Sequence, residues 1–108
     1  MSNFIYVNGQ YYRKENARVF VNDRGYQFGD SVYEVVLFRN NIFYDFKDHV
    51  DRLRRSLSSL DFNLNKTDKV LFLICKYLIK LNNISFGSVY IQVSRGVFDR
   101  DHSYKNMK

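Results

Sequence analysis

The pattern of hydrophobic and polar positions begins with two short runs of the kind that form β-strands. Phe4 to Val7 and Gln10 to Arg13 are rich in aromatic and β-branched residues and are separated by Asn8-Gly9. An Asn-Gly pair tolerates the positive φ angles that a two-residue turn requires. The pattern therefore predicts a β-hairpin near the start of the chain.

A second hairpin and a returning strand follow from the same pattern. Val32 to Phe38 is a β-branched and aromatic run, Asn40-Asn41 is a turn pair, and Ile42 to Tyr44 is the expected partner strand. Further along, Gly87 to Ser94 alternates as a strand does, and Arg95-Gly96 opens a loop that carries the chain to its end.

Between these strands the hydrophobic period changes to three and four residues, which is typical of helices. A first helix is predicted from about Lys47 to Leu60, with Asp45 as its N-cap. Its apolar stripe consists of Phe46, Val50, Leu53, Leu57 and Leu60. A second helix is predicted from about Thr67 to Leu81 and ends at Asn82-Asn83. It is so densely apolar that we expect most of its circumference to be covered.

Together these elements predict an α+β fold in which an antiparallel β-sheet carries two α-helices on one face. The 108 residues form one domain, 1–108, because no repeat, low-complexity stretch or Gly/Ser linker divides them. A chain of this length buries roughly two-thirds of its unfolded surface, which is enough for one core. Phe and Tyr number 10 and 9, so the core should be unusually aromatic.

Charge and cysteine content narrow the class of protein. A net charge of +6 suits nucleic acids and small anions alike, but the basic residues are scattered, and the one cluster, at Arg52, Arg54 and Arg55, favours a solvated helix face. The single Cys75 lies in an apolar run, where a buried thiol is the ordinary expectation. No run approaches the roughly 20 apolar residues of a membrane span. We expect a soluble cytoplasmic protein without nucleic-acid or membrane partners.

Arg52 is a candidate for holding an anion. It precedes the apolar Leu53 at the flank of the helix stripe, and a guanidinium supplies fixed charge and forked donors to a phosphate ester. The alternative is a surface arginine paired with Asp48 or Asp51. His49 is expected to be a half-buried histidine that orders the neighbouring loop, with no chemical role.

Two neighbours on the long strand point to opposite faces. Tyr33 lies on one face with Val35, and Glu34 lies on the other with Val32, because side chains alternate along a strand. A carboxylate in an otherwise apolar strand costs several kilocalories per mole if it is buried without a partner, so Glu34 should face water, a cation or a site. Tyr33 is either a packed tyrosine or a donor to a bound ligand.

Arg100 and His102 are two residues apart in the loop that ends the chain. In an extended segment such residues point to the same side and can hold one carboxylate with charge and hydrogen bonds together. The alternative is a charged loop without a ligand.

Three segments, taken in order, carry a resemblance to a known family. Asp23 to Val36, His49 to Leu53 and Arg95 to His102 resemble the N-terminal small lobe of the D-amino-acid aminotransferases, which are pyridoxal-phosphate enzymes of fold type IV. The resemblance extends from Tyr6 to His102. It implies transfer of the amino group of D-alanine to 2-oxoglutarate, giving pyruvate and D-glutamate.

The resemblance also implies roles for particular residues. Arg52, in the His-x-x-Arg-Leu stretch, would hold the cofactor phosphate. Tyr33 would lie beside the cofactor ring and bind substrate, because its hydroxyl can donate to the substrate carboxylate or to the Schiff-base region. Arg100 and His102 would hold the substrate carboxylate from a loop that reaches across a dimer, with Tyr90 lining the same region. Branched-chain aminotransferases and aminodeoxychorismate lyases generally lack this Arg-x-His pair.

The lysine that forms the Schiff base belongs to the larger lobe of such enzymes, and none of the lysines here occupies a matching position. We therefore expect no catalytic residue and no metal site in this chain, weak or no binding of pyridoxal 5'-phosphate by the chain alone, and no activity on its own. Partners would be amino and keto acids, with a homodimer or an associated large lobe.

Several alternatives stay open. The chain could be the lobe of a branched-chain aminotransferase or an aminodeoxychorismate lyase, or a non-catalytic remnant that serves binding or dimerisation. A nucleic-acid module would instead place stacking aromatics among Lys and Arg on an exposed sheet face, whereas we expect the aromatic strands to pack against helices.

Overall fold

The first hairpin forms as its turn pair predicts. In the computed structural model, which describes residues 3–98, β1 (Phe4–Val7) pairs antiparallel with β2 (Gln10–Arg13). Asn8 and Gly9 both take the positive φ angles of the turn, 48° and 94°. A short 3-10 helix, η1 (Lys14–Asn16), follows the hairpin.

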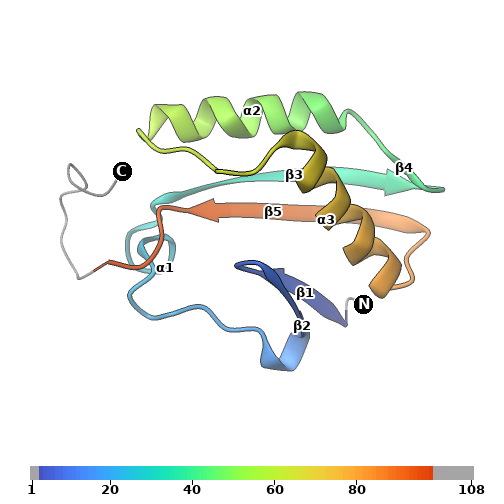
Figure 1. Cartoon of the computed structure of the whole chain (residues 1–108), viewed down its shortest axis with the longest axis horizontal. Helices are drawn as coiled ribbons and strands as arrows, with labels where there is room; N and C mark the ends of the chain where they lie inside the picture. Colours follow the sequence, from blue (N-terminus) through green and yellow to red (C-terminus); the bar gives the residue numbers. More distant parts are fainter. Residues whose placement is uncertain (1–2, 99–108) are drawn as a thin grey trace.

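The remaining strands form a separate three-stranded sheet with the order β4-β3-β5 (Figure 1). β3 (Ser31–Arg39) pairs antiparallel with β5 (Phe86–Ser94) over nine residues, and the short β4 (Ile42–Phe43) joins only the far end of β3. The antiparallel α+β class is confirmed, but the strands form two sheets and not one.

A side-chain clamp explains why the hairpin stands apart from the larger sheet. Asn82, at the end of α3 (Asp68–Leu81), accepts hydrogen bonds from the backbone N–H groups of Asn3 and Phe4 at 2.7 and 2.9 Å. Its amide nitrogen donates to the carbonyl of Phe4 at 3.1 Å. The hairpin is thereby fastened to a helix, and its backbone does not pair with the larger sheet.

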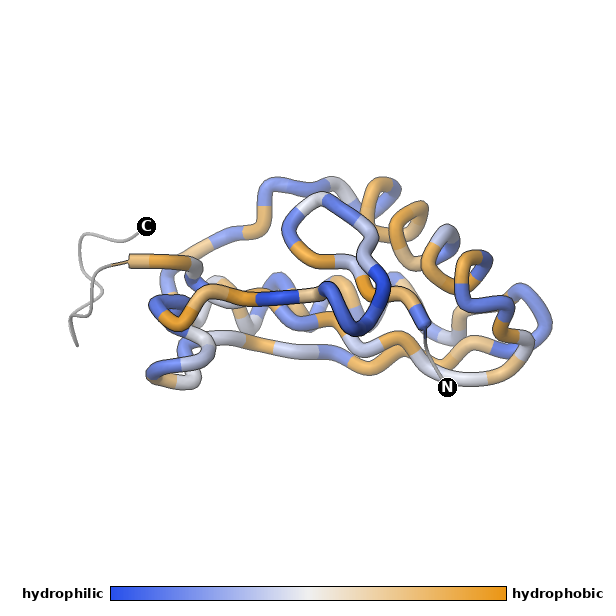
Figure 2. Tube along the Cα trace, turned by 90° about the horizontal axis from the view of Figure 1, so that it is seen from below, coloured by the Kyte–Doolittle hydropathy of each residue, from blue (hydrophilic) through white to orange (hydrophobic). Residues whose placement is uncertain are grey.

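Both long helices lie on one face of the three-stranded sheet, as predicted (Figures 1 and 2). α2 (Phe46–Ser59) packs mainly on β3, and α3 crosses beside it and also contacts β1. The helices bury Val50, Leu53 and Leu57 of α2 and Leu71, Cys75 and Ile79 of α3. These side chains meet Val36, Phe38 and Val89 of the sheet to form the core. No helix of residues 3–98 is long and apolar enough to cross a membrane.

Capping differs between the two helices. Thr67 caps α3, because its hydroxyl oxygen accepts a hydrogen bond from the N–H of Val70 at 3.2 Å. Asp45 precedes α2 but has a left-handed φ of 57° and makes no side-chain capping bond. The N-cap position of Asp45 is as predicted. The prediction that its side chain caps the helix is wrong, because the carboxylate accepts no hydrogen bond from the first turn.

Two expectations about apolar coverage are wrong. α3 is covered only in part: Leu73 and Tyr77 are each about half exposed, at 53% and 47%, although the ring of Tyr77 packs edge-on against Tyr11 of the hairpin. On the sheet face opposite the helices, Tyr33, Phe86 and Tyr90 are also exposed. The helices cover only one face, so alternate aromatic residues on the strands face away from the core.

A short helix, α1 (Arg24–Phe28), has no counterpart in the sequence prediction. The Asp23 carboxylate accepts a hydrogen bond from the N–H of Gly25 at 2.8 Å, and Gly29 ends the helix with a left-handed φ of 64°. Gly25 lies directly against β5: a Cβ there would be 2.8 Å from the Cβ of Ser94. Glycine is therefore required at this contact.

Candidate functional site

Glu34 joins the long strand to α2 through a cluster of three polar side chains. Its carboxylate accepts hydrogen bonds from Nε and Nη2 of Arg52, both at 2.8 Å, one to each oxygen. Nδ1 of His49 lies 2.7 Å from Oε1 of the same carboxylate. Glu34 therefore meets a cation, as predicted, and His49 is a partly buried histidine with a hydrogen-bond partner, which agrees with the half-buried histidine that the sequence predicts.

The two ends of this cluster differ in burial. The side chain of Glu34 is only 6% exposed, whereas that of Arg52 is 61% exposed. Arg52 reaches a hollow of about 290 Å³ that is also lined by Asp45, Asp48, His49 and Arg55. Arg52 is thus anchored on its inner side and open to solvent on the outer side. Within residues 3–98 the partner of Arg52 is Glu34 and neither Asp48 nor Asp51, and Asp51 pairs with Lys47 instead.

The arginine changes the acidity of Glu34. Hydrogen bonds from Arg52 are the main cause that lowers the pKa of Glu34 to about 2; burial opposes them, and the contact with His49 adds to them. Glu34 is therefore an anion at neutral pH.

We expect the stability of the domain to depend on pH through Glu34. The folded pKa of about 2 lies below the ordinary value of 4.5. The carboxylate thus stabilises the fold above pH 4.5, by on the order of 3 kcal/mol, and this is lost as the pH falls toward 2. In urea titrations at several pH values, the difference in unfolding free energy between wild type and Glu34→Gln should shrink on acidification. A difference that is constant with pH would contradict this.

The open face of the sheet brings together two other predicted site residues. The rings of Tyr33 on β3 and Tyr90 on β5 stack with centroids 5.5 Å apart and planes inclined by 14°. The hydroxyl of Tyr90 donates to Gln92 at 3.3 Å, and the Gln92 amide donates to the hydroxyl of Ser31 at 3.1 Å. The aromatic pair is flanked by polar groups and remains accessible from solvent.

The two groups of residues lie on opposite faces of β3. Tyr33 belongs to the open face, and its neighbour Glu34 belongs to the face that α2 covers. β4 pairs only with Phe38 and Arg39, so no strand of residues 3–98 pairs with the start of β3 on that side. The structure thus places Tyr33 and Arg52 at the same end of β3 without direct contact between them.

Arg100 and His102 lie outside the described residues, but the structure shows what fixes the segment before them. Asp30 Oδ2 accepts hydrogen bonds from Nε of Arg24 at 2.8 Å and from Nε of Arg95 at 2.6 Å. Nη2 of Arg95 also donates to the carbonyl of Leu60. These interactions tie α1, the start of β3 and the end of β5 together.

The two arginines favour the charged form of the carboxylate between them. Burial by itself would raise the pKa of Asp30, but the hydrogen bonds from Arg95 and Arg24 outweigh burial and lower it. Each guanidinium also lies over an aromatic ring 4.6 Å away, Phe28 for Arg24 and Phe62 for Arg95. This cluster was not predicted, although Asp30 and Arg95 both flank predicted strands.

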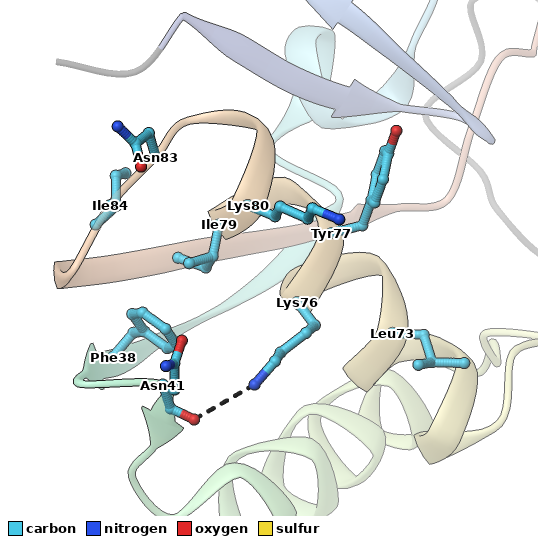
Figure 3. Close-up of a pocket in the computed structure, with 9 residues that line it drawn as sticks. All are labelled: Phe38, Asn41, Leu73, Lys76, Tyr77, Ile79, Lys80, Asn83 and Ile84. Atoms are coloured by element: carbon cyan, nitrogen blue, oxygen red, sulfur yellow. Dashed lines mark hydrogen bonds between the residues drawn. The ribbon is translucent and has the colours of Figure 1, made fainter.

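A larger hollow of about 600 Å³ lies elsewhere, between α3 and the β3–β4 turn (Figure 3). Lys76 spans it and donates to the carbonyl of Asn41 at 3.4 Å. Its lining is Phe38, Asn41, Leu73, Lys76, Tyr77, Ile79, Lys80, Asn83 and Ile84. None of the predicted site residues lines this hollow, and we therefore place the candidate site at Arg52 and Tyr33.

Comparison with known proteins shows the family of this chain. The family model described as amino-transferase class IV matches residues 31–107. A D-alanine aminotransferase of Staphylococcus epidermidis is 36% identical over 100 residues, which cover 93% of this chain and 36% of that protein. A D-alanine aminotransferase of Listeria monocytogenes is 42% identical over 93 residues, covering 86% of this chain and 32% of that protein.

A solved structure supports the fold. The branched-chain amino acid aminotransferase from Escherichia coli superposes with a TM-score of 0.85 at 22% identity, covering 97% of this chain and 36% of that one. At this identity the likeness shows the fold alone, and it matches the small N-terminal lobe of fold type IV enzymes. The chain spans about a third of the length of the relatives it matches, and it belongs to the class IV aminotransferases.

Proposed function

We propose that this chain serves as the N-terminal lobe of a D-amino-acid aminotransferase, contributing contacts to the cofactor phosphate and to the substrate carboxylate. The observation that carries the proposal is the position of Arg52, held by a buried carboxylate on one side and open to a hollow on the other. It coincides with the phosphate-holding arginine that the His-x-x-Arg-Leu stretch implies.

Class IV aminotransferases use pyridoxal phosphate, and Arg52 fits the phosphate of that cofactor. A guanidinium carries five N–H donors, of which Glu34 uses two. Within residues 3–98 the hydrogens of Nη1 have no protein acceptor, so a forked pair of donors remains for an anion. The cofactor, when bound, would supply the electron sink for amino-group transfer.

The substrate side rests on the open face and on the loop after β5. Tyr33 offers an exposed phenol hydroxyl beside the ring of Tyr90, and these would line the substrate region. Arg100 and His102 would supply charge and a hydrogen bond to the substrate carboxylate. The substrates would be D-amino acids and 2-oxo acids.

Two observations set this proposal apart from its alternatives. The curated relatives at 36% and 42% identity are D-alanine aminotransferases, whereas the branched-chain enzyme shares only the fold. The Arg100-Asp101-His102 sequence also favours a D-amino acid over a branched-chain substrate.

Reconstitution tests the proposal. The chain would be mixed with, or fused to, the large lobe of a related D-alanine aminotransferase that lacks its own small lobe, and pyruvate formation from D-alanine and 2-oxoglutarate would be measured. Activity that needs both parts supports the proposal. A folded complex without activity would favour the non-catalytic domain, and a preference for L-branched-chain substrates would favour the branched-chain enzyme.

We expect Arg52→Ala to weaken retention of the cofactor in this reconstituted enzyme whichever substrate is used. Loss of a charge-assisted contact to a phosphate costs on the order of 2–3 kcal/mol, which corresponds to a loss of roughly 30- to 150-fold in affinity. The measurement is the absorbance of bound cofactor during dialysis. Arg54→Ala is the matched control, since Arg54 lies on the same helix and pairs with Asp68. Equal retention in both variants would contradict the role of Arg52.

We also expect the isolated chain to self-associate at micromolar concentration. Leu73 and Tyr77 on α3, and Phe86 and Tyr90 on the open sheet face, leave large apolar side chains in solvent. Light scattering over a wide range of concentrations should show a mass above the 13.0 kDa of one chain, and Phe86→Glu should lower it. A strictly monomeric mass at every concentration would contradict this expectation.

A further inference from the structure

Glu34 is the one acidic residue among the buried side chains of residues 3–98, and its place is set by the strand. Alternation along β3 directs Glu34 to the face that α2 covers, the same face as Val36 and Phe38, which are fully buried. Burying a carboxylate there is costly unless it is paired. An arginine can pair with a carboxylate through one N–H donor or through two, and the geometry of the Arg52–Glu34 pair shows which donors remain for a ligand.

Arg52 and Glu34 form a bidentate ion pair. Nε of Arg52 donates to Oε2 and Nη2 donates to Oε1, so the carboxylate occupies one edge of the planar guanidinium. His49 holds Oε1 from another side at 2.7 Å, which fixes the carboxylate itself. The carboxylate of Glu34, held by His49, therefore fixes the plane of the Arg52 guanidinium.

This arrangement leaves one edge of the guanidinium available. The two hydrogens of Nη1 and the second hydrogen of Nη2 are directed away from the edge that Glu34 occupies, because the five donors have fixed directions. The Arg52 side chain is 61% exposed on the hollow. A phosphate could therefore be bound by two parallel N–H donors without displacing Glu34.

We propose that Glu34 is a positioning residue that holds the Arg52 guanidinium with its Nη1–Nη2 edge toward the phosphate. This rests on the proposed function, in which Arg52 holds that phosphate. The conformational freedom of the long arginine side chain is lost on folding and not on binding, which strengthens binding. Asp45 and Asp48 line the same hollow as Arg52 and Arg55, so orientation of donors, and not an excess of positive charge, favours the anion there.

The positioning role and simple electrostatics predict opposite changes in phosphate affinity when Glu34 is removed. If Glu34 acted only through its negative charge, its removal would strengthen binding of any anion at residue 52. If it orients a planar guanidinium, its removal weakens binding to arginine. It should not weaken binding to a lysine, whose ammonium group needs no such orientation.

The test uses the 108-residue chain and inorganic phosphate as the probe, with affinities from nuclear magnetic resonance titrations in the millimolar range. Glu34→Gln should weaken phosphate binding about tenfold in the wild-type background, the lower end of the losses seen when a supporting partner is removed. In the Arg52→Lys background the same change should strengthen binding. Asp68→Asn, which removes the charge of the carboxylate that accepts from Nε and Nη2 of Arg54 through its single oxygen Oδ1, should leave phosphate affinity unchanged.

Each outcome bears on one of the two proposals. Stronger phosphate binding after Glu34→Gln in both backgrounds overturns the positioning role and leaves Arg52 as the anion ligand. Unchanged phosphate binding after Arg52→Ala overturns the role of Arg52 itself, and with it the proposed function.

A second measurement on the unmodified chain does not depend on whether the variants fold. Phosphate should shift the Nη resonances of Arg52 and leave its Nε–H resonance in place, because Glu34 keeps that donor. If the Nε–H resonance shifts most, phosphate displaces Glu34, and the positioning role is wrong.

Discussion

Replacing Asp30 by alanine should lower the free energy of unfolding by about 3–5 kcal/mol, the cost of removing one partner from a buried ion pair. Its carboxylate is 11% exposed and bonds to two arginines whose side chains are 5% and 1% exposed. No other single side chain of residues 3–98 joins two buried arginines through its carboxylate. Domains of this size are stabilised by only about 5–15 kcal/mol, so the variant should be largely unfolded in mild urea.

Urea denaturation followed by circular dichroism measures this loss. Asp51→Ala is the matched control: it removes an aspartate from the exposed pair with Lys47, and pairs of that kind contribute about 0.2–1 kcal/mol. Asp30→Asn should fall between the two, because an amide can still accept a hydrogen bond. If Asp30→Ala costs no more than Asp51→Ala, the buried cluster does not hold α1 and the ends of β3 and β5 together.

The elements that the sequence predicts well are those with local signals. The first hairpin follows from Asn8-Gly9, and its strands have the predicted limits. The helices begin and end within one residue of the predicted positions, because an apolar stripe with period 3.6 and a capping threonine at Thr67 are visible in the sequence. Such features depend on neighbours in the chain and need no knowledge of the tertiary fold.

Features that depend on distant contacts were missed. α1 has only five residues, and it is held by the packing of Gly25 against Ser94, which lies 69 residues further along. The division into two sheets depends on Asn82, which bonds to the backbone at Phe4. Periodicity carries no information about pairings at such separations.

The candidate site shows the same division. The cost of a buried carboxylate predicts that Glu34 needs a cation, and the strand period gives the face. The identity of the cation does not follow, because Asp48 and Asp51 are closer to Arg52 in the sequence than Glu34 is. Glu34 is the partner in the structure since it is nearly buried and gains most from a charged donor, whereas Asp51 is exposed and pairs with Lys47. Arg100 and His102 lie outside the described residues, so their roles stay predictions.

Arg100→Ala should cost on the order of 2–4 kcal/mol in kcat/KM for D-alanine when the chain acts together with a large lobe, mainly through a higher KM. The reason is the loss of a charge-assisted contact to the substrate carboxylate. This contact binds the substrate and does not hold the cofactor. Arg52→Ala should instead weaken cofactor retention with any substrate. The measurement is steady-state kinetics with saturating pyridoxal phosphate, which separates the two effects.

Arg18→Ala supplies the matched control for this prediction. Arg18 is exposed, and within residues 3–98 it donates only to the backbone carbonyls of Glu15 and Ala17, so its loss should leave both KM and cofactor retention unchanged. His102→Ala should raise KM in the same direction as Arg100→Ala but by less, because an imidazole offers fewer hydrogen-bond donors to a carboxylate than a guanidinium does. If D-alanine turnover survives Arg100→Ala intact, the loop does not hold the carboxylate. A preference of the same enzyme for L-branched-chain substrates would then assign this lobe to a branched-chain aminotransferase, a class of enzyme that shares this fold.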